Sequence, residues 1–140
     1  GGHGDTTMIP LARYASLKGR PVAELLSEEQ VAKVVTDTMV GGATLTGLLG
    51  TSAWYAPGAA AAYLVDSILH DQKKIIPCCV SLEGEYNQND ICIGVPCVIG
   101  KNGLEEILDY KLNAEETALF EKSAAAVRAT NVVLKEINVL

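Results

Sequence analysis

The 140-residue sequence predicts an α+β domain in which long helices pack on a small, twisted antiparallel sheet. Helix-start signals followed by apolar residues at helical spacing occur early in the chain and again near its end. Between them lie two runs rich in β-branched residues and cysteine, separated by asparagine and aspartate. With 49% hydrophobic and 20% charged residues, the composition is that of one folded domain.

The first predicted helix starts at Ser27 and continues to about residue 49. Ser27 and Gln30 form a capping-box pattern, in which each side chain bonds the other residue's backbone N–H. Glu29 precedes Lys33 by four residues, which predicts an ion pair. Gly41-Gly42 weakens the middle of the helix. Its apolar stripe is expected to comprise Val31, Val34, Val35 and Met39, followed by Leu45, Leu48 and Leu49.

The segments on either side of this helix are predicted from glycine and proline. The first twenty or so residues are interrupted so often by these two residues that we expect a loop with a short strand. "GTSAWYAPG" (50–58) predicts a turn, and "AAAAYLVDSILHD" (59–71) a second helix. The apolar face of this second helix is expected to contain Ala61, Val65, Ile68 and Leu69.

A β-hairpin follows the second helix. "KIIPCCVSLEGEY" forms its first arm, "NQND" (87–90) its turn and "ICIGVPCVIGKNG" its second arm. Pro77 and Pro96 have no N–H to donate to a strand partner, so we expect each at a sheet edge or a bulge.

The four cysteines are expected to be buried, reduced thiols that act as small apolar residues. Neighbouring residues in a strand point to opposite faces, so Cys78 and Cys79 cannot both bind one ion without distortion. The spacing of the pair to Cys92 and Cys97 also matches no paired C-x-x-C zinc pattern. No metal site is therefore predicted.

The last helix is predicted to start at Asn113, with Glu116 completing a second capping box. Its apolar face is expected to contain Leu119, Ala126, Val133 and Ile137.

Charge and hydropathy exclude several classes of function. The net charge is −6, and no cluster of lysine and arginine is present that could neutralise several phosphates, so we expect no nucleic-acid partner. The long uncharged stretch 38–65 is interrupted by glycines and Pro57, which favours buried helices with a turn over a membrane span. No secretory signal is visible. A cytoplasmic protein without membrane contact is expected.

His3 is the first candidate functional residue. It lies between Gly2 and Gly4, whose lack of side chains lets a substrate approach the imidazole closely. Histidine is also well suited to exchange a proton near neutral pH. On chemistry alone, however, a single histidine beside glycines is more often a turn residue or the remnant of an expression tag.

Several blocks of the sequence, in order and over nearly the whole chain, resemble the carboxyl-terminal half of the malate and lactate dehydrogenase family. The blocks are "GGHGDTTMIPLARYASLKGRPVAELL", "GGATLTGLLGTSAWYAPGAAAAYLVDSIL", "IIPCCVSLEGEY", "DICIGVPCVIGKNGLEEIL" and "LNAEETALFEKSAAAVR". The resemblance implies a catalytic domain over residues 1–140. It also implies that an amino-terminal Rossmann domain, which binds NAD in this family, is absent from this chain, since no G-x-G-x-x-G occurs in it.

The resemblance implies NAD-dependent, reversible oxidation of (S)-malate to oxaloacetate. Gly2 stands where lactate dehydrogenases carry glutamate, and "TSAWYAPGAA" resembles the segment of the lactate-dehydrogenase-like malate dehydrogenases of bacteria. Malate is therefore favoured over lactate. L-lactate or another 2-hydroxyacid as substrate stays an alternative, because the selectivity arginine of the family lies upstream. The choice between NAD and NADP also belongs to the upstream half.

The resemblance also implies roles for single residues. His3 matches the catalytic histidine, which takes the hydroxyl proton of malate and returns it in the reverse reaction. Pro57 matches a residue near the nicotinamide, and Ala53 matches a small residue of the substrate pocket. For both, packing at a helix start is the competing interpretation.

Three more polar residues are expected to act outside the chemistry. The aspartate that orients the family's histidine lies upstream, so we expect Asp5 only to tie down its loop through backbone hydrogen bonds. Arg13 is expected to have a structural or interface role. His70 is expected to face solvent near a helix end.

The family is commonly dimeric or tetrameric, so a homo-oligomer is expected. The chain by itself is expected to be inactive, because it cannot build a dinucleotide site. An alternative is that the domain acts only as an oligomerisation module. A related NAD-dependent glycosidase would need metal-binding cysteine and histidine, which the cysteine pattern does not suggest.

Overall fold

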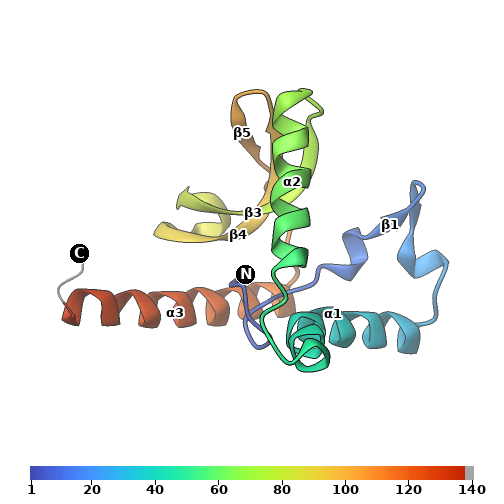
Figure 1. The fold of residues 1–140 in the computed structure, drawn as a ribbon, viewed down its shortest axis with the longest axis horizontal. Coiled ribbons are helices and arrows are strands. Elements are labelled where there is room, and N and C mark those ends of the chain that lie inside the picture. The colour runs from blue at the N-terminus through green and yellow to red at the C-terminus, as the bar shows by residue number, and fades with distance from the viewer. Residues whose placement is uncertain (138–140) are drawn as a thin grey trace.

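The computed structural model describes residues 1–137 and confirms the α+β class. Short elements come first along the chain, and two long helices follow. The main sheet comes next, and a third long helix ends the described part (Figure 1). In chain order the elements are η1 (Ala12–Tyr14), β1 (Ser16–Leu17), β2 (Arg20–Pro21), η2 (Val22–Glu24), α1 (Glu28–Leu49), α2 (Tyr55–Leu69), β3 (Lys74–Glu83), η3 (Glu85–Asn87), β4 (Asn89–Gly100), β5 (Gly103–Ile107) and α3 (Ala114–Glu136).

The main sheet has three antiparallel strands in the order β3-β4-β5. The predicted hairpin is β3 and β4, but its reversal lies at Gly84–Gln88, about three residues before the predicted "NQND" turn. Gly84 has a φ of 131°, which favours glycine, so the chain turns there. β5 was not predicted, because its five residues are too short to give a strand signal of their own.

The two strand prolines pair directly with each other, Pro77 opposite Pro96. Because neither has an N–H, this pair lacks the ladder hydrogen bonds without leaving a donor unpaired. Pro77 is on the edge strand β3, as predicted. The prediction for Pro96 was wrong: it lies in the central strand, and the register irregularities of the sheet are elsewhere, at Leu82/Glu83 in β3 and at Val98/Ile99 in β4.

One face of the sheet forms the core, and α2 and α3 cover it (Figure 1). Alternate residues of β4 are buried there, as expected for a strand with one covered face. The core residues are Leu82, Ile91, Ile93, Val95, Cys97, Ile99, Phe120 and Ala124.

Both capping boxes are confirmed. Ser27 Oγ accepts from the Gln30 amide at 3.3 Å, and the Gln30 side chain accepts from the Ser27 amide at 2.9 Å. Asn113 and Glu116 do the same at the start of α3, with both distances 2.8 Å. Each box satisfies two backbone N–H groups that a helix start leaves without partners.

The predicted helix faces were largely wrong. In α3, Leu119, Val133 and Ile137 are exposed, while Phe120, Ser123, Ala124 and Val127 pack on the sheet. In α2, Ala61, Val65 and Leu69 are exposed, and Leu64, Ser67 and Ile68 pack inward. Both helices carry apolar residues on several sides, so periodicity alone does not identify the buried side.

The helix α1 runs without a break through Gly41-Gly42, yet none of its residues is buried. Figure 1 shows it extending away from the sheet. The predicted ion pair from Glu29 is replaced by one four residues on, between Lys33 Nζ and Asp37 Oδ2 at 2.7 Å. Val31, Val35 and Met39 are only half-buried. None of the helices in residues 1–137 combines the length and apolar character that a membrane crossing needs.

Candidate active site

His3 lies on an irregular loop that precedes η1 and is fixed to the central strand. The Gly1 nitrogen donates to Gly94 O at 2.7 Å, and the Gly94 amide donates back to Gly1 O at 3.1 Å. A Cβ atom on Gly94 would lie 2.7 Å from Gly1 O, closer than real Cβ contacts. Only glycine at position 94 therefore allows this loop to approach the sheet so closely.

A turn follows His3 and reverses the loop. The amides of Thr7 and Met8 both donate to Gly4 O, at 3.0 and 2.8 Å. The Asp5 side chain, which was expected to tie down this loop, is exposed and makes no hydrogen bond within residues 1–137. That prediction was wrong, since backbone groups of the turn supply the bonds instead.

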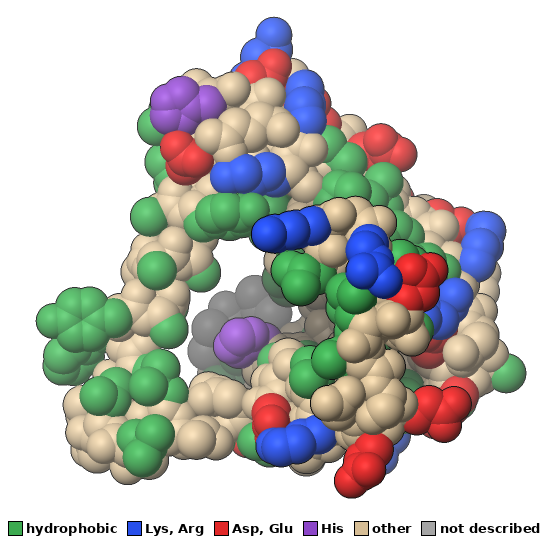
Figure 2. Space-filling view, turned by 90° about the vertical axis from the view of Figure 1, so that its right-hand side faces the viewer, with side chains coloured by type: hydrophobic (Ala, Val, Ile, Leu, Met, Phe, Trp, Pro, Cys, Tyr) green, Lys and Arg blue, Asp and Glu red, His purple; other side chains and the backbone are tan. Residues whose placement is uncertain are grey.

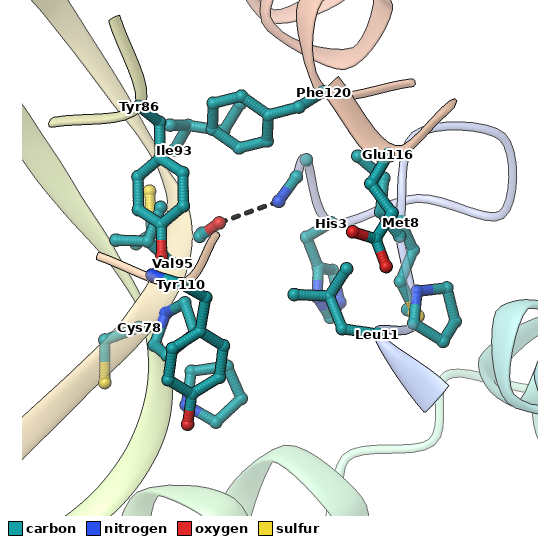
Figure 3. Close-up of a pocket in the computed structure, with 18 of the residues that line it drawn as sticks. His3, Met8, Leu11, Cys78, Tyr86, Ile93, Val95, Tyr110, Glu116 and Phe120 are labelled. Carbon is teal, nitrogen blue, oxygen red and sulfur yellow. Dashed lines mark hydrogen bonds between the residues drawn. The ribbon is translucent and has the colours of Figure 1, made fainter. Parts of the chain in front are cut away.

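His3 is exposed and lines a cavity of about 870 Å³. Figure 3 shows His3, Met8 and Leu11 on one side of the cavity and Tyr86, Val95 and Tyr110 on the other. In the space-filling view of Figure 2, a histidine side chain lies inside a hollow of the surface. The imidazole is therefore open to a molecule that enters the cavity.

The cavity is mainly apolar. Within the described part of the chain no lysine or arginine lines it, and Glu116 is the one charged side chain that does. The Glu116 carboxylate is engaged by Arg13, with Nε–Oε1 and Nη2–Oε2 distances of 2.7 Å. The hydrogen bonds of Arg13 hold the pKa of Glu116 below its usual value. The cavity thus offers His3 and apolar walls, but no cation for an anionic ligand.

Arg13 has the structural role that the sequence predicted. Besides Glu116 it donates to Lys111 O, and the same carbonyl accepts from the Tyr14 hydroxyl at 2.9 Å. Tyr14 also stacks on Tyr110, with ring centroids 4.4 Å apart. These contacts join η1 to the segment that enters α3, and Tyr14, Tyr110 and Glu116 line the cavity.

Ala53 and Pro57 do not line the cavity of His3. Ala53 is half-buried in the connection between α1 and α2, and Pro57 is exposed. Pro57 is the third residue of α2, which begins four residues earlier than predicted. A proline is tolerated in the first turn of a helix, because no residue of that turn needs its N–H for an intrahelical bond.

The prediction for His70 is confirmed: it is exposed at the end of α2, and its Nδ1 lies 2.9 Å from Asp66 Oδ1. The prediction for the cysteines was wrong in part. All four are free thiols, but only Cys97 is buried, Cys78 is half-buried, and Cys79 and Cys92 are exposed. The two exposed residues, Cys79 and Cys92, lie on the sheet face opposite the core, as strand alternation requires. Burial raises the pKa of Cys97 to about 11.

No three His, Cys, Asp or Glu side chains of residues 1–137 gather in an arrangement that could hold a metal ion. A dinucleotide would find only part of a site here. The apolar walls beside His3 fit a flat ring such as nicotinamide. The lining without lysine or arginine does not fit a pyrophosphate.

Ser123 is a site residue that the sequence interpretation missed. It is 2% exposed and bonds the loop on both sides of His3. Phe120, Ser123, Ala124 and Val127 follow helical spacing on one face, but other sides of this helix are apolar too, so spacing alone did not identify the face that contains Ser123. A serine within such a face needs a hydrogen-bond partner.

Comparison with known proteins gives the family. Residues 1–136 match the family model described as lactate/malate dehydrogenase, alpha/beta C-terminal domain. The malate dehydrogenase of Flavobacterium frigidimaris is 75% identical over 137 residues, which are 98% of this chain and 44% of that protein.

Solved structures agree. A malate dehydrogenase from Salinibacter ruber has a TM-score of 0.91 at 43% identity, covering 99% of this chain and 45% of the other. A lactate dehydrogenase from Eimeria maxima, solved with NADH and oxamate, has a TM-score of 0.89 at 35% identity, covering 98% and 44%. The chain thus spans a little under half the length of these relatives. It belongs to the lactate/malate dehydrogenase family and corresponds to its alpha/beta C-terminal domain.

Proposed function

We propose that this chain is the catalytic part of an NAD-dependent malate dehydrogenase, which interconverts (S)-malate and oxaloacetate. The observation that supports this proposal most strongly is the position of His3. Its imidazole is open to an apolar cavity, and its loop is bonded to β4 through Gly1 and Gly94. The names of the relatives support malate: the Flavobacterium protein, 75% identical, is a malate dehydrogenase.

In this proposal His3 moves a proton at the substrate hydroxyl. In malate oxidation the neutral imidazole accepts the C2 hydroxyl proton, and in the reverse direction the imidazolium donates it to the carbonyl oxygen. NAD, when bound, supplies the hydride acceptor. Once the accompanying domain and the substrate cover the cavity, its apolar walls keep water from this end of the site, which strengthens the hydrogen bond between substrate and imidazole.

The remaining binding groups must come from outside residues 1–137. A dicarboxylate needs cations, and Arg13, which contacts Glu116 in the cavity wall, is already paired with that carboxylate. The pyrophosphate of NAD needs a phosphate cradle as well. We therefore propose that a Rossmann domain accompanies this chain in the working enzyme. In that enzyme Pro57 faces the cofactor and Ala53 faces the substrate. We also propose that the enzyme is cytoplasmic.

The test uses a hybrid enzyme, in which this chain replaces the matching region of the Flavobacterium frigidimaris malate dehydrogenase. We expect it to reduce oxaloacetate with NADH, with kcat/KM within about tenfold of the parent, and to discriminate strongly against pyruvate. Preference for pyruvate would favour the lactate alternative. An inactive hybrid that binds NAD like the parent would overturn the proposal.

A second candidate, a role in assembly, rests on the exposed apolar surface of α1 and α2. Leu48 is 80% exposed and Tyr55 81% exposed. Apolar side chains exposed together on neighbouring elements are typical of protein contacts. We propose that this surface contributes to a homo-oligomer, dimer or tetramer. Light scattering on the chain and on the hybrid enzyme tests this, and monomers of both would contradict it.

A further inference from the structure

The loop that carries His3 closes on a single buried hydroxyl. Ser123 Oγ accepts a hydrogen bond from the Gly2 amide at 2.7 Å. The same hydroxyl donates to Thr7 O at 2.8 Å. A hydroxyl group can accept and donate at once, so Ser123 ties together the residue before His3 and the end of the turn after it.

This geometry differs from that of the other hydroxyl side chains in the same helix. Thr117 Oγ1 donates to Asn113 O at 2.8 Å, and Thr130 Oγ1 donates to Ala126 O at 3.2 Å. Both follow the usual helical pattern, in which serine or threonine bonds the carbonyl four residues earlier. Ser123 instead reaches a segment 116 positions away in the sequence. Its hydroxyl therefore serves the loop rather than the helix.

The contact leaves no room for a side chain at either glycine before His3. A Cβ on Gly1 would lie 2.5 Å from Thr7 O and 3.1 Å from Ser123 Oγ. A Cβ on Gly2 would lie 2.8 Å from Thr7 Oγ1. The two glycines let the backbone wrap closely around the hydroxyl, and Gly94 holds the loop from the sheet side.

The His3 ring, by contrast, forms no hydrogen bond with any side chain or backbone group of residues 1–137. Its position in this chain is therefore set by the backbone on either side of it. We propose that Ser123 is a positioning residue for His3: its hydroxyl fixes the loop so that the imidazole meets the substrate in reactive geometry. This inference rests on the function proposed above.

The test compares Ser123→Ala with Ser67→Ala in the hybrid enzyme. Ser67 is a matched control, because it is also buried and its hydroxyl also makes a hydrogen bond between elements, to Ile99 O at 2.8 Å. That bond joins α2 to β4 and does not contact the His3 loop. Both variants lose a buried hydroxyl and are expected to lose similar stability.

We expect Ser123→Ala to lower kcat by about 10- to 100-fold, since a displacement of about 1 Å in a reacting group has effects of that size. The Kd for NADH should stay within twofold, and Ser67→Ala should keep kcat within twofold. Ser123→Thr retains the hydroxyl and should recover most of the lost kcat. Hydrogen exchange of residues 2–8 should accelerate in Ser123→Ala and not in Ser67→Ala.

Equal losses of kcat in the two alanine variants, or unchanged exchange of residues 2–8 in Ser123→Ala, would overturn the inference while leaving the proposed function intact. A wild-type hybrid that turns over neither malate nor oxaloacetate would overturn the proposed function, and the role of Ser123 in catalysis with it. If Ser123→Ala does not fold, Ser123→Thr tests the inference, because it keeps the hydroxyl. A folded threonine variant whose kcat is about 10- to 100-fold below that of the wild-type hybrid would contradict the inference.

Discussion

The sheet with α3 and the helix α1 are both rich in apolar residues, yet they differ in what covers them. In the sheet, every second residue of β4 from Ile91 to Ile99 is buried, against α2 and α3. In α1, a helix of 22 residues, none is buried. The first region is complete within this chain. The second presents apolar surface that this chain leaves uncovered.

The candidate catalytic residue belongs to the complete region. The loop of His3 is bonded to β4 through Gly94 and to α3 through Ser123, two parts of the rigid core. Pro57 and Ala53, which are expected to face cofactor and substrate, belong to the uncovered region, Pro57 in the first turn of α2 and Ala53 in the connection before it. Under the function proposed above, the two regions have a division of labour: this chain positions the acid–base group, and the binding surfaces form when another part of the enzyme covers α1 and α2.

The largest expected effect concerns turnover. If the uncovered region needs another part of the enzyme, the 140-residue chain alone has no measurable malate dehydrogenase activity, because no lysine or arginine of residues 1–137 lines the His3 cavity to bind a dicarboxylate or a pyrophosphate. An assay of the isolated chain with NAD and malate checks this, with the hybrid enzyme as the positive control. Ordinary turnover by the isolated chain would contradict the division of labour.

The next effect concerns stability and compares the two regions directly. Leu82 in β3 is fully buried, so Leu82→Ala should lower the free energy of unfolding by about 2–5 kcal/mol. Leu48 in α1 is 80% exposed, so Leu48→Ala should change it by less than about 0.5 kcal/mol. Urea unfolding of the chain measures both. Similar losses would mean that α1 packs on this chain more closely than the structure indicates.

The smallest effect concerns pH at the entrance to α3. Hydrogen bonds from Arg13 lower the pKa of Glu116 in the folded chain. A carboxylate with a lowered folded pKa stabilises the protein above its ordinary pKa of 4.5, and this contribution is lost as the pH falls through the folded value. Glu116→Gln should therefore reduce stability at pH 7 but less so at pH 3.

The matched control for this prediction is Glu121→Gln, which changes an exposed glutamate in the middle of the same helix. No hydrogen bond or ion pair within residues 1–137 engages the Glu121 side chain, so this variant serves as the reference for the pH dependence of Glu116→Gln. If Glu116→Gln shows no more pH dependence than this control, the ion pair with Arg13 does not contribute to stability.

Sequence patterns predicted the fold well where the stabilising interactions join residues that are close in the sequence. The capping boxes at Ser27 and Asn113 depend on residues three positions apart, and both form. The inward faces of α2 and α3 were not predictable from periodicity, because alanine and valine occur around both helices. Which side is buried depends on the sheet, and Phe120 faces it while Leu119 does not.

The site divides in the same way. His3 was predicted from its block of sequence and its catalytic role stays a prediction, whereas Arg13 was correctly assigned a structural role. Ser123 was missed because its partners, Gly2 and Thr7, are more than 110 residues away, and no local pattern reports such a contact. Asp5 was predicted to hold the loop because it is close to His3 in the sequence. In the structure the loop is held by the Ser123 hydroxyl, which is distant in the sequence.

The central claim is that the imidazole of His3 transfers the proton. The most direct test replaces, one at a time, the two histidines that this chain contributes to the hybrid enzyme. His3→Asn should lower kcat by about 10²- to 10⁴-fold with the Kd for NADH nearly unchanged. His70→Asn, which changes the exposed histidine at the end of α2, should leave kcat within twofold. A His3→Asn enzyme with kcat near that of the wild type, or one that loses NADH affinity as strongly as kcat, would contradict the account.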